Sequence, residues 1–289
     1  MDLSRFAAAV GAEGPVTIAG TRSRGGSVPD VRCVEAPAGI ERIQADEMIV
    51  SCGAATTMSA LDQALGEVGQ TVALPTSGTV GGALSVGRSD IRRLGYGPVR
   101  DVLLQAEYIS STGTVVKAGG PTVKNVSGFD LCRLLVGSRG TLGFLGAVIL
   151  RTRPLPMASR WYRRAGPPWP VFAMLYRPVS VLWDGTATFV LLEGHPGDVD
   201  EQAAIAALRP VDGPPVLPTT GRWSVPPADI RHLDGTTGFV AEIGVGIVHS
   251  ADPAPVRLQQ QAIAELHGRL KHEFDPAGRL NPGVDALVV

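Results

Sequence analysis

Short β-prone runs and an amphipathic helical segment alternate along the first 150 residues, separated by glycine-rich loops. Apolar and β-branched residues at 16–18, 48–52 and 142–150 predict strands. Thr57 precedes apolar residues at helical spacing and predicts the N-cap of a helix. This alternation of strand and helix periods is typical of an α+β fold.

A hairpin and a change of composition complete this first part of the chain. The apolar run 101–110 and the run 114–117 flank a Ser-Thr-Gly turn and predict a β-hairpin, and residues 130–136 predict a short helix. The proline- and arginine-containing segment 151–156 then marks a change in composition. We therefore expect a first domain over residues 1–153.

A second, smaller α+β domain is expected over residues 154–289. Its pattern predicts strands at 188–192 and 239–248 and a helix at 198–208. The last helix, about 254–274, has apolar residues on one face, and the tail that follows is rich in turn-forming residues.

Small-residue loops follow or precede three of the predicted strands, at residues 20–23, 75–82 and 137–143. Glycine lets backbone amides approach an anion closely, so such loops can hold a pyrophosphate without a lysine. A mononucleotide P-loop is excluded because the chain contains no Gly-Lys dipeptide. The GxxGxxG spacing at 137–143 leads into a strand, which also disfavours a Rossmann dinucleotide site.

Composition narrows the expected partners and location. A formal net charge of -1 gives no general reason to bind nucleic acid or anionic lipid. The N-terminal residues lack a signal-peptide pattern, and the longest apolar run is too short to cross a membrane, so we expect a cytoplasmic protein without membrane insertion. Cys33, Cys52 and Cys132 are widely spaced and are expected to be core thiols.

Five motifs occur together in one order: Ala19-Gly20-Thr21-Arg22-Ser23, Leu74-Pro75 with Thr79-Val80-Gly81-Gly82, Tyr96-Gly97 with Arg100-Asp101, Lys124-Asn125 with Gly128-Phe129-Asp130, and Gly137-Ser138-Arg139-Gly140-Thr141-Leu142-Gly143. In this series the chain resembles the FAD-binding domain of the vanillyl-alcohol oxidase and p-cresol methylhydroxylase (PCMH) flavoproteins. It is most similar to the FAD-binding subunit of bacterial glycolate oxidases, through Val123-Lys124-Asn125-Val126, Phe274-Asp275-Pro276 and Asn281-Pro282-Gly283.

The resemblance implies a PCMH-type FAD-binding domain of two subdomains, followed by a reduced cap domain whose C-terminal tail returns to the flavin. It also implies where the cofactor is bound. The cofactor-binding residues carried over are Gly20, Thr21, Arg22, Ser23, Pro75, Thr76, Ser77, Gly78, Thr79, Val80, Gly81, Gly82, Lys124, Asn125, Gly137, Ser138, Gly140, Thr141, Leu142 and Gly143. No His or Cys stands where covalent members attach their flavin, so we expect non-covalent FAD.

Catalytic candidates are fewer. Related hydroxy-acid dehydrogenases carry a cap motif of the form GHxGDGNLH, of which this chain keeps only His249, so no metal site is expected. His249 is a candidate substrate-side base or an ordinary structural histidine. Lys124 is a candidate cation beside the reduced flavin or a surface lysine. Asn281 is placed at the flavin edge by the resemblance.

Two functions from different classes follow, and a third is weaker. The first is an FAD-dependent oxidoreductase subunit that oxidises a glycolate-like α-hydroxy acid by hydride transfer and passes electrons to a partner. Because the chain has no cysteine cluster, onward transfer would need an iron–sulfur subunit, beside a sister flavoprotein subunit, with peripheral membrane association through these partners. The alternative is a non-catalytic FAD-binding partner subunit of a glycolate oxidase-like complex. A reductase related to the UDP-N-acetylmuramate reductases is disfavoured by the motif at 124–130.

Overall fold

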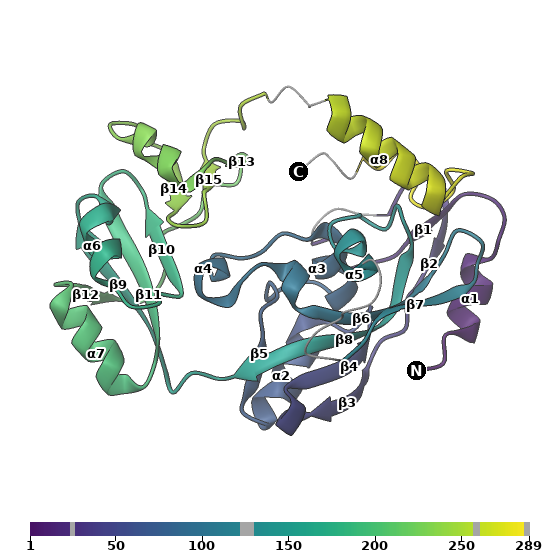
Figure 1. The fold of residues 1–289 in the computed structure, drawn as a ribbon, viewed down its shortest axis with the longest axis horizontal. Coiled ribbons are helices and arrows are strands. Elements are labelled where there is room, and N and C mark those ends of the chain that lie inside the picture. The colour runs from purple at the N-terminus through teal and green to yellow at the C-terminus, as the bar shows by residue number, and fades with distance from the viewer. Residues whose placement is uncertain (24–26, 122–129, 257–260, 286–289) are drawn as a thin grey trace. The chain divides into compact units, whose positions relative to one another are not determined.

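The computed structural model describes residues 1–23, 27–121, 130–256 and 261–285. Two compact units make up the fold (Figure 1), and each is discontinuous in sequence. The first comprises Met1–Asp90, Pro98–Leu155 and Gln259–Val288, and the second comprises Ile91–Gly97 and Pro156–Leu258. The sequence predicted a single boundary, after residue 153. In the structure, residues 91–97 belong to the second unit and residues 259–288 belong to the first.

A single antiparallel sheet organises the first unit. Its strands follow the order β3 (Ile40–Gln44), β4 (Ile49–Gly53), β8 (Phe144–Pro154), β6 (Leu103–Ile109) and β7 (Val115–Gly119), and β5 (Gln70–Val72) pairs with the end of β8. The strand β8 is the longest, with 11 residues, and lies between β4 and β6. Its side chains alternate between the two faces, so Val148 and Leu150 join one buried cluster and Ala147 joins another.

Helices α2 (Met58–Glu67), α3 (Val80–Val86) and α5 (Leu131–Leu135) contribute to the larger of these clusters. Thr57 caps α2 as expected, since its Oγ1 accepts a hydrogen bond from Ala60 N at 3.3 Å. The predicted hairpin and short helix also form, as β6–β7 and α5. Short 3-10 turns, η1 (Ala45–Glu47) and η2 (Val99–Asp101), lead into β4 and β6.

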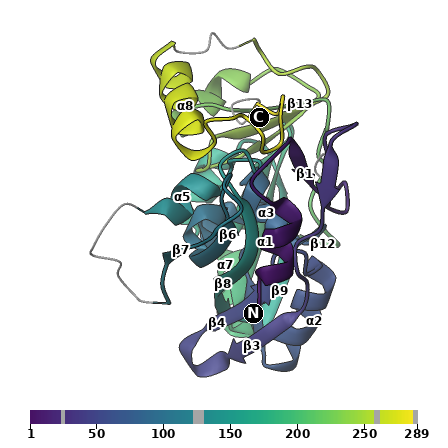
Figure 2. The same cartoon turned by 90° about the vertical axis from the view of Figure 1, so that its right-hand side faces the viewer.

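Helix α1 (Ser4–Val10) packs against the smaller cluster, which includes residues of β6 and β8 (Figure 2). The parallel pair β1 (Val16–Ile18) and β2 (Arg32–Val34) adds Val16 and Val34 to the same cluster. Leu280, from the segment after helix α8 (Gln261–Phe274), pairs with Val16 and is fully buried there. The C-terminal segment is therefore part of the first unit's core.

The second unit is built on a seven-stranded sheet. Its order is β12 (Arg209–Val211), β9 (Ala158–Ala165), β11 (Ala187–Gly194), β10 (Ser180–Trp183), β14 (Phe239–Glu242), β15 (Ile247–Ser250) and β13 (Gly221–Ser224). The helices α6 (Pro168–Met174) and α7 (Pro196–Ile205) and the 3-10 helix η3 (Pro227–Leu233) supply residues to its core around Trp183. Leu94, from the short helix α4 (Arg93–Tyr96), also packs there.

Several expectations were wrong in detail. The strand expected at 239–248 is the hairpin β14–β15, because Gly244 and Gly246 adopt positive φ and reverse the chain. The loop expected at 75–82 ends early, because α3 begins at Val80. Cys33 is exposed, unlike the buried Cys52 and Cys132.

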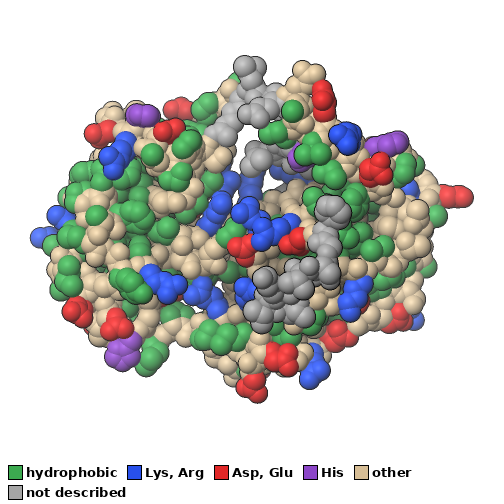
Figure 3. Space-filling view, viewed as in Figure 1, with side chains coloured by type: hydrophobic (Ala, Val, Ile, Leu, Met, Phe, Trp, Pro, Cys, Tyr) green, Lys and Arg blue, Asp and Glu red, His purple; other side chains and the backbone are tan. Residues whose placement is uncertain are grey.

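Side chains of both charges lie on the surface (Figure 3). Figure 3 shows acidic and basic side chains on the same face of the molecule, in keeping with the formal net charge of -1. Within the described ranges, no helix is long and apolar enough to cross a membrane.

Candidate functional site

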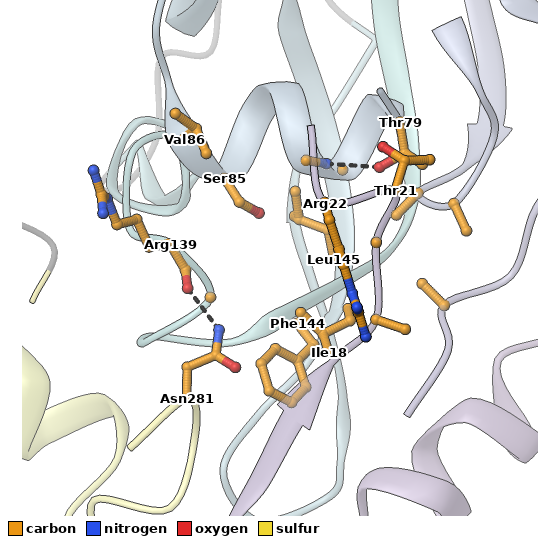
Figure 4. Close-up of a pocket in the computed structure, with 18 of the residues that line it drawn as sticks. Ile18, Thr21, Arg22, Thr79, Ser85, Val86, Arg139, Phe144, Leu145 and Asn281 are labelled. Atoms are coloured by element: carbon orange, nitrogen blue, oxygen red, sulfur yellow. Dashed lines mark hydrogen bonds between the residues drawn. The ribbon is translucent and has the colours of Figure 1, made fainter. Parts of the chain in front are cut away.

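A cavity of about 300 Å³ lies within the first unit (Figure 4). Its walls include the loop after β1, the residues that follow β2 and β4, helix α3, the turn before β8 with the start of that strand, and the C-terminal segment. It is lined by Ile18, Ala19, Gly20, Thr21, Arg22, Ser23, Ala36, Ala54, Ala55, Thr79, Gly81, Gly82, Ser85, Val86, Arg139, Gly140, Phe144, Leu145, Asn281 and Val284.

Backbone strain is concentrated around this cavity. Seven described non-glycine residues have positive φ, and three of them line it: Arg22 (φ 59°), Arg139 (φ 52°) and Asn281 (φ 45°). A left-handed conformation costs an L-residue roughly 1–2 kcal/mol. Strain of this kind persists only where the surrounding structure enforces it, and it gathers at ligand sites.

The loop after β1 presents free backbone donors. The amide of Ala19 is bound to Val34 O at 2.8 Å, but the amides of Gly20, Thr21 and Arg22 make no hydrogen bond to another described residue. A left-handed residue beside such amides produces a concave nest, in which successive N–H groups point at one anion. The exposed guanidinium of Arg22 adds a positive charge to this end of the cavity.

The second predicted loop has a different role. The amides of Val80, Gly81 and Gly82 are already bound, to Thr56 O, Ala54 O and the Oγ1 of Thr79 at 2.7–3.1 Å, so they are not free for a phosphate. Gly81 is required by packing instead, because a Cβ there would lie 2.9 Å from the Cβ of Ala54. Thr79, Gly81 and Gly82 line the cavity, whereas Pro75, Thr76, Ser77, Gly78 and Val80 are not among its lining residues.

The turn before β8 is fastened to the C-terminal end of α3. Gly137 N donates to Leu84 O at 3.0 Å, and Arg139 N donates to Ser85 O at 2.8 Å. Of the residues predicted here, Gly140 lines the cavity. Gly137, Ser138, Thr141, Leu142 and Gly143 are absent from the lining. The hydroxyl of Ser138 donates to Leu135 O at the end of α5, and that of Thr141 donates to Ser138 O.

Asn281 forms hydrogen bonds to two other segments that border the cavity. Its Oδ1 accepts a hydrogen bond from Thr17 Oγ1 at 2.8 Å, and its Nδ2 donates to Arg139 O at 2.7 Å (Figure 4). Its backbone N donates to Val16 O at 2.9 Å. One side chain thus joins β1, the turn before β8 and the C-terminal segment, and both ends of its amide are engaged in positioning them.

A buried carboxylate holds the segment that carries Asn281. Asp275 is 1% exposed, and its oxygens accept from Arg279 N at 3.1 Å, Leu280 N at 2.8 Å and Lys271 Nζ at 2.5 Å. Lys271 also donates to Thr141 O at 2.8 Å, which links this anchor to the turn before β8. The guanidinium of Arg279 donates to five backbone carbonyls, of Val10, Gly11, Glu13, Gly14 and Ser111.

The remaining predicted residues lie elsewhere. His249 is on β15 in the second unit, where its Nε2 lies 2.8 Å from Oε1 of Glu242. Glu242 is buried, with 2% of the residue exposed. His249 is not among the residues that line the cavity. Lys124 and Asn125, with Gly128 of the same motif, fall outside the described residues.

Sequence reasoning missed the apolar walls. Ile18, Ala54, Phe144 and Leu145 have no motif of their own, because a cavity wall and a protein core use the same residue types. Ala36, Ala55, Ser85, Val86 and Val284 were also missed. Within the described lining there is no carboxylate, imidazole, amine or thiol. No group of three or more metal-ligating side chains occurs in the ranges that the structure describes.

Comparison with known proteins identifies the type of domain. Residues 34–119 match the model of the FAD binding domain family. The whole fold is similar to that of alkyldihydroxyacetonephosphate synthase, with a TM-score of 0.65 over 97% of this chain and 72% of that one, at 15% sequence identity. Residues 34–119 are therefore similar to FAD binding domains, and the mixed helix-and-sheet fold agrees with the α+β class expected from the sequence.

Parts of the chain are also similar in sequence to curated proteins. The chain is 36% identical over 144 residues to a D-lactate dehydrogenase of Archaeoglobus fulgidus, covering 47% of this chain and 32% of that protein. It is 34% identical over 162 residues to the glycolate oxidase subunit GlcE of Escherichia coli, covering 52% of this chain and 45% of that protein. The matched segments span less than half the length of these curated relatives.

The cavity's chemistry fits FAD. A nest of free amides with an arginine suits a pyrophosphate, and apolar walls that include Phe144 and Ile18 suit a flat ring system. Gly20 leaves room at the nest, since a Cβ there would meet no atom within 4 Å. The cofactor expected from sequence is thus supported by the family match and by the residues present.

Proposed function

We propose that this chain is the FAD-binding subunit of an oxidoreductase that oxidises a 2-hydroxy acid, such as glycolate or lactate, and passes the electrons to a partner. The observation that carries the proposal is the FAD-type cavity in a chain whose sequence matches glycolate oxidase and D-lactate dehydrogenase proteins. When bound, FAD supplies a two-electron hydride acceptor that can return electrons singly.

In this proposal the chain's own residues bind and orient the cofactor. The amides of Gly20, Thr21 and Arg22 hold the pyrophosphate, and the Arg22 guanidinium balances its charge. Phe144 contributes an apolar wall, and the hydrogen bonds of Asn281 hold β1 and the turn before β8 in position. Binding is non-covalent, because the described lining offers no His or Cys to form a bond with the flavin.

Substrate chemistry needs a base, and the cavity's described lining does not provide one. We assign this role to His249, whose Nε2 is held by the buried carboxylate of Glu242 at 2.8 Å, an arrangement that fixes the imidazole ring. Lys124 is the proposed cation beside the flavin. Electrons would leave through a sister flavoprotein subunit and an iron–sulfur subunit, and these partners would carry any peripheral membrane association.

A second function is favoured by the same lack of acid–base groups in the described lining. In it the chain binds FAD but performs no chemistry, and a sister subunit oxidises the hydroxy acid.

The first experiment is a visible absorption spectrum of the purified chain before and after FAD is added. We expect a yellow holoprotein, and a colourless chain that takes up no FAD would refute both functions. Anaerobic glycolate and D-lactate are then added to the isolated chain and to the chain purified with its partners. Bleaching of the isolated chain supports an enzyme, whereas bleaching only with partners supports the second function.

The His249→Gln variant refines the result. If His249 is the base, the rate of flavin bleaching falls by roughly 100-fold or more, while the affinity for FAD stays within a factor of two. An unchanged bleaching rate would remove His249 from the mechanism. The Gln side chain keeps a hydrogen-bonding partner for Glu242, so a general loss of fold is not expected.

A further inference from the structure

Arg88 and Arg139 are carried by two backbone segments that are joined at the C-terminal end of α3. We propose that Arg88 and Arg139 together bind the carboxylate of the 2-hydroxy acid, as a site distinct from the nest at residues 20–22. This inference rests on the proposed function and names the part of the site that recognises the acid. Arg139 lines the cavity, and Arg88 follows the last residues of α3.

The backbone holds the two arginines close to each other. Gly87 ends α3 in a left-handed conformation, with its N bound to Ala83 O at 3.0 Å. A Cβ on Gly87 would lie 2.9 Å from Gly137 Cα, so the two segments of the chain are in contact at this point. On the other side of that contact, Arg139 N is bound to Ser85 O at 2.8 Å. Arg88 and Arg139 therefore belong to two segments that are held together by this hydrogen bond and by the contact between Gly87 and Gly137.

One hydrogen-bond donor of the Arg88 guanidinium, its Nε–H group, has no acceptor among the described residues. This Nε is buried. Burial lowers the pKa of Arg88, and the positive charge of Arg139 lowers that pKa further. A buried guanidinium N–H without an acceptor, beside a second cation, is unfavourable until an anion supplies the acceptor. A carboxylate has two oxygens and matches the planar fork of a guanidinium.

The position along α3 separates this site from the pyrophosphate. Figure 4 shows Thr21 and Thr79 at one end of the helix, and Ser85, Val86 and Arg139 at the other. A helix of seven residues is about 10 Å long. The free amides of the nest can therefore hold the cofactor's phosphates while the two arginines hold a second, separate anion.

The test uses a hydroxy acid that cannot be oxidised. 2-Hydroxyisobutyrate has no hydrogen on its α-carbon, so it can occupy the site without donating a hydride, and 2-hydroxyisobutyramide is its neutral counterpart. Both are titrated into the FAD-loaded full chain, with the change in visible flavin absorption as the readout. Calorimetric titration of the same ligands decides the question independently of any flavin signal. We expect the acid to bind at least 10-fold more tightly than the amide.

Three variants assign the effect to residues. Arg88→Gln and Arg139→Asn should each weaken acid binding by about 10- to 100-fold while leaving amide binding within a factor of two, and Arg88→Gln should leave the Kd for FAD within a factor of two. Asparagine is chosen at Arg139 because it tolerates the left-handed backbone there. Arg88→Lys should restore part of the affinity. The control is Arg151→Gln, an exposed arginine on β8 that lies seven residues from Phe144, roughly 23 Å along the strand.

The outcomes separate this inference from the proposed function. Equal affinity for acid and amide, or variants that bind the acid as the wild type does, would overturn it. If Arg88→Gln weakens FAD binding instead, the two arginines belong to the cofactor's phosphates and the inference also fails. If the chain takes up no FAD yet binds the acid through both arginines in calorimetry, the proposed function fails and the carboxylate site stands.

Discussion

Replacing Asp275 with asparagine tests the anchor that brings the C-terminal segment to the cavity. The carboxylate accepts from two backbone amides and from Lys271, and the residue is 1% exposed. Oδ1 of Asp275 accepts from Arg279 N, whereas Oδ2 accepts from both Leu280 N and Lys271 Nζ. The NH₂ group of an asparagine must therefore face Arg279 N, or else both Leu280 N and the Lys271 ammonium. In either orientation at least one hydrogen bond is lost and a donor faces a donor, and the attraction between the Lys271 ammonium and a full negative charge is removed.

The expected cost follows from these contacts. A hydrogen bond to a charged group contributes about 1.5–3 kcal/mol, and a neutral one about 1 kcal/mol. Lys271 keeps two carbonyl acceptors and is 31% exposed at its side chain, so its charge is not stranded. We therefore expect Asp275→Asn to lower the free energy of unfolding of the first unit by about 3 kcal/mol, or roughly 6–12 °C in Tm.

The tryptophans allow the two units to be followed separately. Trp161, Trp169, Trp183 and Trp223 all belong to the second unit, so tryptophan fluorescence reports that unit while far-UV circular dichroism reports both. Asp275→Asn should lower the dichroism transition more than the fluorescence transition. The matched control is Asp101→Asn, since Asp101 pairs with Arg133 at 3.7 Å on the surface of the same unit and should cost less than 1 kcal/mol. Equal, small effects of both variants would refute the reasoning.

Three further outcomes test the site and the core. Asn281→Gly keeps the left-handed backbone but removes both side-chain hydrogen bonds, so the Kd for FAD should rise about tenfold, as measured by fluorescence quenching; an unchanged Kd would contradict the positioning role. Arg22→Gly should raise the Kd for FAD while leaving the Tm of the apoprotein unchanged or slightly higher, because glycine relieves the left-handed strain; a lower apo Tm would argue against strain at this residue. Burial raises the pKa of Cys52 to about 12 and that of Cys132 to about 11, so at pH 8 iodoacetamide should alkylate only the exposed Cys33 in the native protein and all three thiols after denaturation. Mass spectrometry that finds rapid native labelling at Cys52 would contradict the buried core.

Local signals in the sequence predicted much of the first unit. The cap at Thr57 and the hairpin turn at 111–113 are short-range features, and both form as expected. The start of α3 was not predictable, because Gly81 and Gly82 disfavour a helix by propensity. Only the tertiary contact between Gly81 and Ala54 explains why glycine is present there.

The site was predictable only where a motif supplied it. Gly20, Thr79, Gly140 and Asn281 belong to such motifs and line the cavity. Phe144 lies in a strand whose pattern resembles that of any buried strand, so the sequence did not predict that Phe144 lines the cavity. The pairing of His249 with Glu242 depends on the hairpin β14–β15, which the sequence pattern presented as one strand.

Because Asn281 completes a site that begins with Thr17, the cavity can be finished only after translation has passed residue 281. The two residues are 264 positions apart, which at about 5–20 residues per second is roughly 13–53 s of translation. Until Asn281 leaves the ribosome, the loop after β1 lacks the side chain that positions it, so cofactor loading is confined to chains that have been made at least that far. Nascent chains interrupted before residue 275 should remain without FAD, and cofactor uptake then serves as a record that translation has passed Asn281.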